Sequence, residues 1–159
     1  SDRLYNKIRN AAPGFLGLPE LEIENFLKLD ELGIKYHHES YEVAPGWLLM
    51  HGDEGNVQPT AGATALGLAK RAGMSVVCGH THRMGLTHYT QAWHRGSRTV
   101  WGMEVGHLMD LKYAKYIRGA LFTWQQGFGI LHVDGKNVMP QLVPIVNDSF
   151  TVDGKVYRW

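Results

Sequence analysis

The stretch V-V-C-G-H-T-H-R, residues 76–83, sets two histidines one residue apart directly after an apolar run. Residues 75–78 are too few for a helix and carry small and apolar side chains, which predicts a buried strand. A run of the same kind stands at residues 47–50, and the small residues at 61–72, closed by Gly73, predict a helix between the two. The order strand, helix, strand favours a parallel pair in an α/β domain.

Outside this core the chain changes from helical to β character. Towards the N-terminus, the pattern predicts helices at 2–11 and 19–32 and short strands at 34–36 and 40–43. Towards the C-terminus, it predicts a helix at 110–118 and strands at 87–93, 98–103, 129–133 and 138–146. Asp134-Gly135 and Asp153-Gly154 are typical of tight hairpin turns. We therefore expect a single α/β domain over residues 1–159, with mixed strands followed by antiparallel ones.

The composition is that of a folded, water-soluble domain. Hydrophobic residues make up 44% of the 159 positions and charged residues 19%, which excludes disordered and fibrous classes. The net charge of +1 provides no general attraction to nucleic acid or to an anionic membrane. No apolar run approaches the roughly 18 residues of a membrane-spanning helix. The single cysteine, Cys78, cannot form an internal disulfide, so we expect a reducing, cytoplasmic location.

Three histidines, His51, His80 and His82, follow directly on the two predicted parallel strands. The carboxyl ends of such strands are where open α/β sheets bind ligands. Neutral imidazole is a common ligand of first-row metal ions. If residues 79–82 stay extended, His80 and His82 point to the same side and reach either two adjacent ions or one. The alternative without a ligand is a hydrogen-bonded cluster in a turn.

Two motifs carry a resemblance to a known family. Met50-His51-Gly52 ends a strand with His-Gly, and Gly79-His80-Thr81-His82 forms Gly-His-x-His further along the chain. In this order and spacing they resemble the C-terminal half of calcineurin-like metallophosphoesterases, above all those of phages and bacteria. The flanking segments that are also similar are Asp2-Arg3-Leu4, Thr81-His82-Arg83, residues 101–106, residues 124–128 and the closing Asp-Gly hairpins.

The resemblance implies that residues 1–159 are the C-terminal part of a metallophosphoesterase β-sandwich flanked by helices. The family's three earlier motifs, Asp-x-His, Gly-Asp-x-x-Asp and Gly-Asn-His, do not occur in this sequence, and Ser1 would stand just after the last of them. It further implies that His51 and His80 bind one metal ion and that His82 binds a second. The bridging aspartate, the asparagine ligand and the catalytic histidine would all lie upstream. We therefore expect no catalytic residue in this chain and no activity of the chain alone.

The activity that the resemblance implies is hydrolysis of phosphate esters by two divalent ions. Such ions polarise the ester and lower the pKa of the attacking water. We expect manganese, with zinc or iron as the alternatives, because the completed ligand set would mix nitrogen and oxygen. The expected partners are a phosphate-ester substrate, with nucleic acid included, and either the N-terminal half or a second copy of the chain. No membrane partner is expected.

Further polar residues lie near these motifs. The guanidinium of Arg83 could bind a substrate phosphate with two parallel hydrogen bonds. The alternative is that Arg83 is a solvent-exposed charge at the end of a strand. Glu104, His107 and Asp110 are spaced by three, which suits one helical face. We expect this second group to make structural hydrogen bonds or to support the metal ligands.

Two rival functions stay open. In the first, the chain is a catalytically inactive binding or structural module derived from this fold. In the second, it is a hydrolase whose single metal ion is held by His51, His80 and His82. Metal stoichiometry separates the three hypotheses, which require two ions, none or one.

Overall fold

The computed structural model describes residues 7, 10–12, 14, 18–37, 39–110, 112 and 122–159. The chain divides into two units, Ser1–His38 and Glu39–Trp159, which we describe in turn. The predicted helices at 2–11 and 110–118 lie mostly outside the described residues. No helix within these described ranges is both long enough and apolar enough to cross a membrane.

In the first unit the predicted helix at 19–32 is broken into short pieces. A 3₁₀ helix, η2, covers Pro19–Leu21, and α2 covers only Ile23–Phe26. No residue of either piece is buried. A helix gains most of its stability from packing an apolar face against the rest of a protein, and among the residues described here these two pieces bury no such face. The expected strand at 34–36 does not form.

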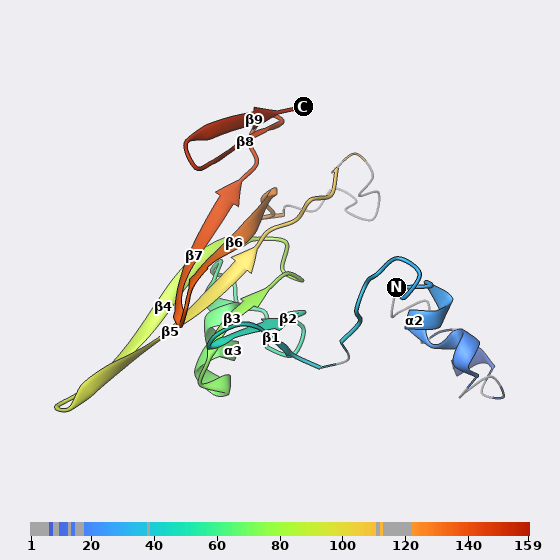
Figure 1. Ribbon diagram of the computed structural model, residues 1–159, viewed down its shortest axis with the longest axis horizontal. Coiled ribbons are helices and arrows are strands. Elements are labelled where there is room, and N and C mark those ends of the chain that lie inside the picture. Colours follow the sequence, from blue (N-terminus) through green and yellow to red (C-terminus); the bar gives the residue numbers. More distant parts are fainter. Residues whose placement is uncertain are drawn as a thin grey trace. The chain divides into compact units, whose positions relative to one another are not determined.

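The second unit is built on a five-stranded sheet (Figure 1). Its elements are β1 (Tyr41–Ala44), β2 (Trp47–Met50), α3 (Ala63–Ala72), β3 (Ser75–Cys78), β4 (Met84–Trp93) and β5 (Gly96–Val105). The strands lie in the order β1-β2-β3-β5-β4. β2 and β3 are parallel, as the strand-helix-strand order predicts, and so are β3 and β5, whereas the other neighbours are antiparallel. The predicted α/β class with a mixed sheet is confirmed.

Two small antiparallel hairpins complete this unit. They pair β6 (Gly127–Asp134) with β7 (Asn137–Pro144), and β8 (Ser149–Val152) with β9 (Lys155–Arg158). The β8–β9 turn is the predicted Asp153-Gly154 pair, whereas in the β6–β7 hairpin Asp134 still pairs with Asn137 and the turn is Gly135-Lys136. Gly135 and Gly154 have φ of 57° and 73°, the left-handed region that glycine adopts without steric cost. The predicted antiparallel character of the later chain is therefore confirmed.

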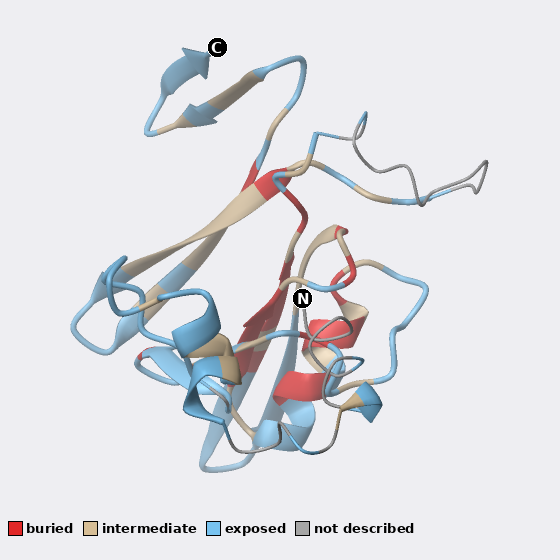
Figure 2. Ribbon diagram, turned by 90° about the vertical axis from the view of Figure 1, so that its right-hand side faces the viewer, coloured by how far each residue is buried: buried red, intermediate tan, exposed pale blue. Residues whose placement is uncertain are grey.

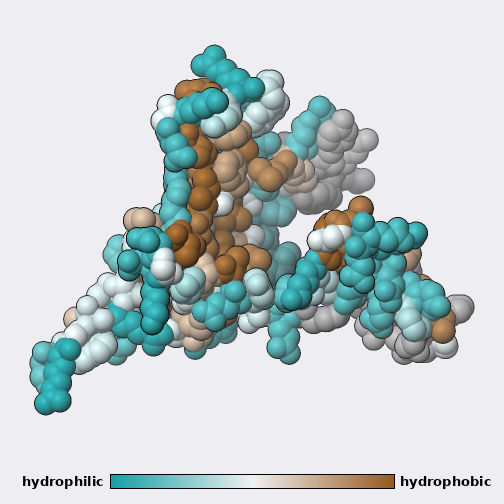
Figure 3. Space-filling view, in the orientation of Figure 1, coloured by the Kyte–Doolittle hydropathy of each residue, from teal (hydrophilic) through white to brown (hydrophobic). Residues whose placement is uncertain are grey.

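The central sheet is covered on both faces. Because side chains alternate along a strand, Val76 and Cys78 of β3 pack against α3, while Val77 lies with Met103 on the other face. On that second face the β6–β7 hairpin contributes Leu131 and other apolar side chains. Figure 2 shows the buried residues gathered in the central strands and on α3. Figure 3 shows hydrophobic side chains gathered over the β6–β7 hairpin.

Two glycines allow α3 to lie directly on the sheet. A Cβ on Gly102 of β5 would overlap the backbone of Leu66, and a Cβ on Gly85 of β4 would overlap the backbone of Ala61 and Gly62. The start of α3 is therefore held beside the C-terminal end of β5 and the N-terminal end of β4. This close packing places the first amides of α3 next to the loop that follows β3.

Candidate functional site

His51 and His80 leave adjacent parallel strands at the same edge of the sheet. Met50, the last residue of β2, is paired with Cys78, the last residue of β3. The amide of Gly79 then donates to the carbonyl oxygen of His51 at 3.2 Å. The register of the two strands thus brings two of the three predicted histidines together.

The imidazoles of His51 and His80 form a hydrogen-bonded pair. Nδ1 of His80 lies 3.0 Å from Nε2 of His51, so one ring nitrogen donates to the other, as in the alternative without a ligand, and the ring centroids are 4.8 Å apart with the rings edge to face. Both side chains are exposed. Gly52 makes this approach possible, because a Cβ there would lie 3.1 Å from Cβ of His80. The φ of Gly52, 113°, is also one that only glycine adopts easily.

A carboxylate that the sequence reasoning missed supports this pair. Glu54 accepts the amide N–H of His51 at 3.2 Å and that of Gly52 at 2.6 Å. Its sequence signal was available, because an acidic residue two or three positions after such a turn is well placed to accept backbone amides. The Glu54 carboxylate therefore holds the backbone from which the His51 ring projects.

His82 lies in a different environment. Its ring is edge-on to Trp124 at a centroid distance of 4.3 Å and lies 5.8 Å from the ring of His107. Its Nδ1 is buried and has no hydrogen-bond partner among the described residues. Burial lowers the pKa of His82, with smaller contributions from His107, His80 and His51, so the ring is neutral at pH 7. A neutral, half-buried imidazole suits metal ligation or hydrogen bonding.

Residues 79–82 are not extended, so the condition under which His80 and His82 would point to the same side is not met. His80 and His82 have φ of 47° and 57°, so the chain turns at both residues. The reason lies in Thr81 between them, whose hydroxyl donates to Glu104 at 2.7 Å and is itself buried. This bond holds Thr81 in the protein, while the ring of His80 is exposed and that of His82 is half-buried against Trp124. Strained backbone of this kind is concentrated at functional sites in proteins.

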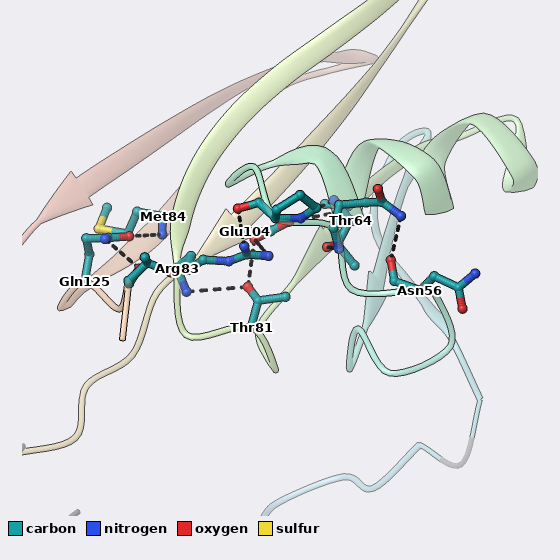
Figure 4. Close-up of polar contacts among 11 residues, drawn as sticks. Asn56, Thr64, Thr81, Arg83, Met84, Glu104 and Gln125 are labelled. Carbon is teal, nitrogen blue, oxygen red and sulfur yellow. Dashed lines mark hydrogen bonds and ion pairs between the residues drawn. The ribbon is translucent and has the colours of Figure 1, made fainter. Parts of the chain in front are cut away.

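Glu104 is the centre of a buried polar network (Figure 4). Its side chain is fully buried, and Oε1 accepts the amides of Thr64 and Ala65 at the start of α3, at 3.0 and 3.4 Å. Oε2 accepts the hydroxyl of Thr81 and lies 3.6 Å from Nη2 of Arg83. One carboxylate therefore joins β5, α3 and the Gly-His-Thr-His loop by the structural hydrogen bonds expected of it, and support of metal ligands stays a prediction.

The helical face expected for Glu104, His107 and Asp110 does not exist. Glu104 is in β5, which ends at Val105, and His107 forms an isolated bridge with Gln126. Asp110 forms an exposed ion pair with Lys112 at 2.6 Å, and this pair lowers the pKa of Asp110. Spacing by three was misleading here because an extended strand, not a helix, leads into this segment.

The side chain of Arg83 is buried, so it is not the solvent-exposed charge that was one of its two expected roles. It is 6% exposed, its Nη1 donates to the carbonyl oxygen of Pro59 at 2.7 Å, and its Nη2 lies beside Glu104. Nη2 has no hydrogen-bond partner among the described residues. The guanidinium thus secures the loop, and contact with a substrate phosphate stays a prediction.

The segment before β6 forms a wall beside His82. The amide of Gln125 donates to the carbonyl oxygen of His82 at 3.0 Å, and its side-chain oxygen accepts the amide of Met84 at 2.9 Å. Trp124 packs on the ring of His82. The sequence reasoning noted residues 124–128 only as part of a resemblance, because their pairing with His82 spans a long stretch of chain.

The three histidines do not form one cluster. Within the described ranges, no three residues among His, Cys, Asp and Glu lie close enough to hold a metal ion together. The structure instead gives the His51–His80 pair on one side and His82 with His107 on the other. This arrangement does not assemble the three-histidine ligand set that the single-metal hypothesis requires.

Comparisons with known proteins connect this chain to two phage proteins. It is 42% identical to the Gene 54 protein of Mycobacterium phage D29 over 159 residues, which is 98% of this chain and 62% of that protein. It is 44% identical to the Gene 54 protein of Mycobacterium phage L5 over 139 residues, which is 86% of this chain and 54% of that protein. The chain therefore spans less than two thirds of either relative. No protein-family model and no solved structure matches it.

Proposed function

We propose that this chain contributes His51, His80 and His82 to a two-metal site that hydrolyses phosphate esters, as in the calcineurin-like metallophosphoesterases. In this proposal the remaining ligands and the catalytic acid come from residues outside positions 1–159. The observation that carries it is the pair of imidazole nitrogens 3.0 Å apart at the ends of two adjacent parallel strands.

The spacing of that pair fits joint ligation of one ion. Two nitrogens that each bind one ion at about 2.1 Å are about 3.0 Å apart at the right angle of octahedral coordination and about 3.4 Å apart in a tetrahedral site. Nδ1 of His80 and Nε2 of His51 are at this separation, on exposed side chains that an ion can reach. The His51–His80 pair therefore suits one ion, and His82 is left for a second.

The need for further ligands follows from the same geometry. Two imidazoles do not complete a coordination shell, and no carboxylate of the described residues joins them. Divalent ions in hydrolytic sites generally have carboxylate ligands that balance and bridge their charges. Both relatives are longer than this chain, and ligands supplied by additional residues agree with that length difference.

In the proposed site this chain's own residues orient ligands and exclude water. The metal ions, when bound, would polarise the ester and activate water. Glu104 and Arg83 hold the Gly-His-Thr-His loop, and Glu54 holds the turn at His51. Trp124 covers one side of His82. The five-stranded sheet with the β6–β7 hairpin packed on it would form part of the family's β-sandwich.

The substrate class and metal follow from the resemblance. We propose phosphomonoesters or phosphodiesters, with nucleic acid among the diesters, and manganese before zinc or iron. A mixed set of nitrogen and oxygen ligands suits these ions. In the complete protein, Arg83 would add positive charge behind the loop that faces the substrate.

One observation favours a second candidate, a catalytically inactive binding module. The ring nitrogens of His51 and His80 lie 3.0 Å apart and can satisfy each other by a hydrogen bond without a metal ion. The two candidates differ in a direct way, because the module binds no divalent ion when the upstream motifs are restored.

The test combines this chain with a polypeptide that carries the three upstream motifs. We expect two Mn²⁺ ions per complex by calorimetry, and hydrolysis of an aryl phosphodiester by the mixture but by neither component. His80→Ala and His82→Ala should each abolish activity and lower Mn²⁺ affinity at least about tenfold. His132→Ala is the matched control, because His132 bonds Gln141 on the distant β6–β7 hairpin. Activity of the 159-residue chain alone, or indifference to both ligand variants, would overturn the proposal.

A further inference from the structure

We infer that His107 binds the substrate, with its Nε2–H donating a hydrogen bond to a phosphoryl oxygen. This inference rests on the proposed function, since it places the phosphate beside the metal ligand His82. His107 lies outside the metallophosphoesterase motifs His-Gly and Gly-His-x-His of this chain.

The backbone of His107 is fixed against the segment that precedes β6. Its amide donates to the carbonyl oxygen of Gln125 at 3.1 Å, and its carbonyl oxygen accepts the amide of Gly127 at 3.0 Å. The side chain is 8% exposed. The ring lies 5.8 Å from the ring of His82 and 6.0 Å from that of Trp124, measured between centroids. The His107 ring therefore lies in the wall of the site, next to a proposed metal ligand.

The protonation state of the ring follows from one hydrogen bond. The amide N–H of Met109 donates to Nδ1 of His107 at 3.2 Å. Nδ1 must then be an acceptor, so a neutral ring carries its proton on Nε2. A nitrogen that carries a proton cannot ligate a metal. This excludes His107 as a third imidazole ligand and makes its Nε2 a donor.

That donor is buried and has no acceptor within the described part of the chain. Buried polar groups in proteins are nearly always hydrogen-bonded, and an exception calls for an explanation such as a bound ligand. Nη2 of Arg83 does not add a second free donor, because it lies 3.6 Å from Oε2 of Glu104 in a buried ion pair.

The chemistry of a group that could bind Nε2 follows from its role as a donor. A group that accepts this N–H beside a metal ligand must offer an acceptor oxygen, and it must tolerate positive charge. The phosphoryl oxygens of a phosphate ester meet both conditions, and so do those of free phosphate. A cation and a purely apolar ligand meet neither of them.

The test measures phosphate binding and tautomer, independently of turnover. Long-range ¹H–¹⁵N spectra of the metal-free chain should show the His107 proton on Nε2. Calorimetric titration with inorganic phosphate in the presence of Mn²⁺ should give a Kd about tenfold or more higher for His107→Phe than for the wild type. His107→Gln, which retains a donor near the position of Nε2, should recover most of the affinity. Mn²⁺ affinity should be equal in all three proteins.

Each contrary result has a distinct meaning. A proton on Nδ1, a loss of Mn²⁺ affinity in His107→Phe, or an unchanged phosphate Kd with Mn²⁺ bound would overturn the role of His107 and leave the proposed function intact. Failure of every variant and of the wild type to bind Mn²⁺, even with the upstream motifs supplied, would overturn the proposed function. The phosphate Kd of His107→Phe without metal would then still decide whether His107 binds a phosphoryl group.

Discussion

Replacement of Glu104 by glutamine should weaken both the fold and the candidate site. Glu104→Gln keeps the shape of the side chain and removes its charge. One oxygen can still accept the amides of Thr64 and Ala65, but an amide group now faces Arg83 and the Thr81 hydroxyl. The guanidinium of Arg83, only 6% exposed, would lose its buried counter-ion.

The magnitude follows from the contacts of the carboxylate. A hydrogen bond to a charged group contributes about 1 kcal/mol more than a neutral one, so the bonds to Thr64, Ala65 and Thr81 together give about 3 kcal/mol. This agrees with the cost of separating a buried ion pair, about 3–5 kcal/mol. For a chain of this length, a loss of about 3 kcal/mol lowers Tm by roughly 6–12 °C.

Thermal and urea denaturation measure this loss, and Glu42→Gln is the matched control. Glu42 accepts a single amide, that of Gly46, at 3.0 Å on the surface, so its replacement should change stability by less than about 0.5 kcal/mol. Because Thr81 lies between two proposed metal ligands, Glu104→Gln should also lower Mn²⁺ affinity about tenfold in the complemented protein. A Glu104→Gln protein as stable as the control would refute the reasoning about the buried network.

Three further predictions concern single groups in the same unit. Burial, aided by the charges of Glu104 and Glu54, raises the pKa of Cys78 to about 12. Iodoacetamide at pH 8 should therefore alkylate Cys78 only after the protein unfolds. Rapid alkylation of the native protein would contradict this. Burial lowers the pKa of His82 below 6.5, so the unfolded chain binds the proton more tightly than the folded one. The free energy of unfolding of the metal-free protein, measured by urea titration, should therefore fall as the pH drops below about 6.5. The pH dependence should be weaker in His82→Gln. Gly102→Ala should lower the free energy of unfolding by about 1–3 kcal/mol, because the added Cβ would overlap α3. Gly67→Ala, on the open face of α3, should raise the free energy of unfolding by about 0.5–1 kcal/mol. Equal melting temperatures of the two variants would disprove the close packing.

Local patterns predicted most of the second unit. Strands β2 and β3 begin and end at the expected residues, and their parallel pairing follows from the helix between them. The Asp-Gly turns predicted both small hairpins. The helix predicted at 19–32 is limited to η2 and to α2 at Ile23–Phe26, and none of the residues in these two pieces is buried, so its periodic apolar residues do not gain the packing that stabilises a longer helix.

The candidate site was predicted in composition but not in arrangement. His51 and His80 come together because neighbouring parallel strands end at one edge, a consequence of topology that the sequence pattern contains. The position of His82 could not be predicted in this way. It depends on Thr81 bonding to Glu104 and on Trp124 packing against the ring.

The sequence by itself determined which residues form the central strands, the helix between them and the hairpin turns, because hydrophobic periodicity and glycine conformation act over a few neighbouring residues. Only the tertiary structure decided that Glu104 bonds the start of α3 from 40 positions away, that Arg83 is buried, and that His107 lies beside His82. Contacts of this kind depend on how closely helix and strand approach each other in space. Residues so far apart in the chain leave no periodic signal of such an approach.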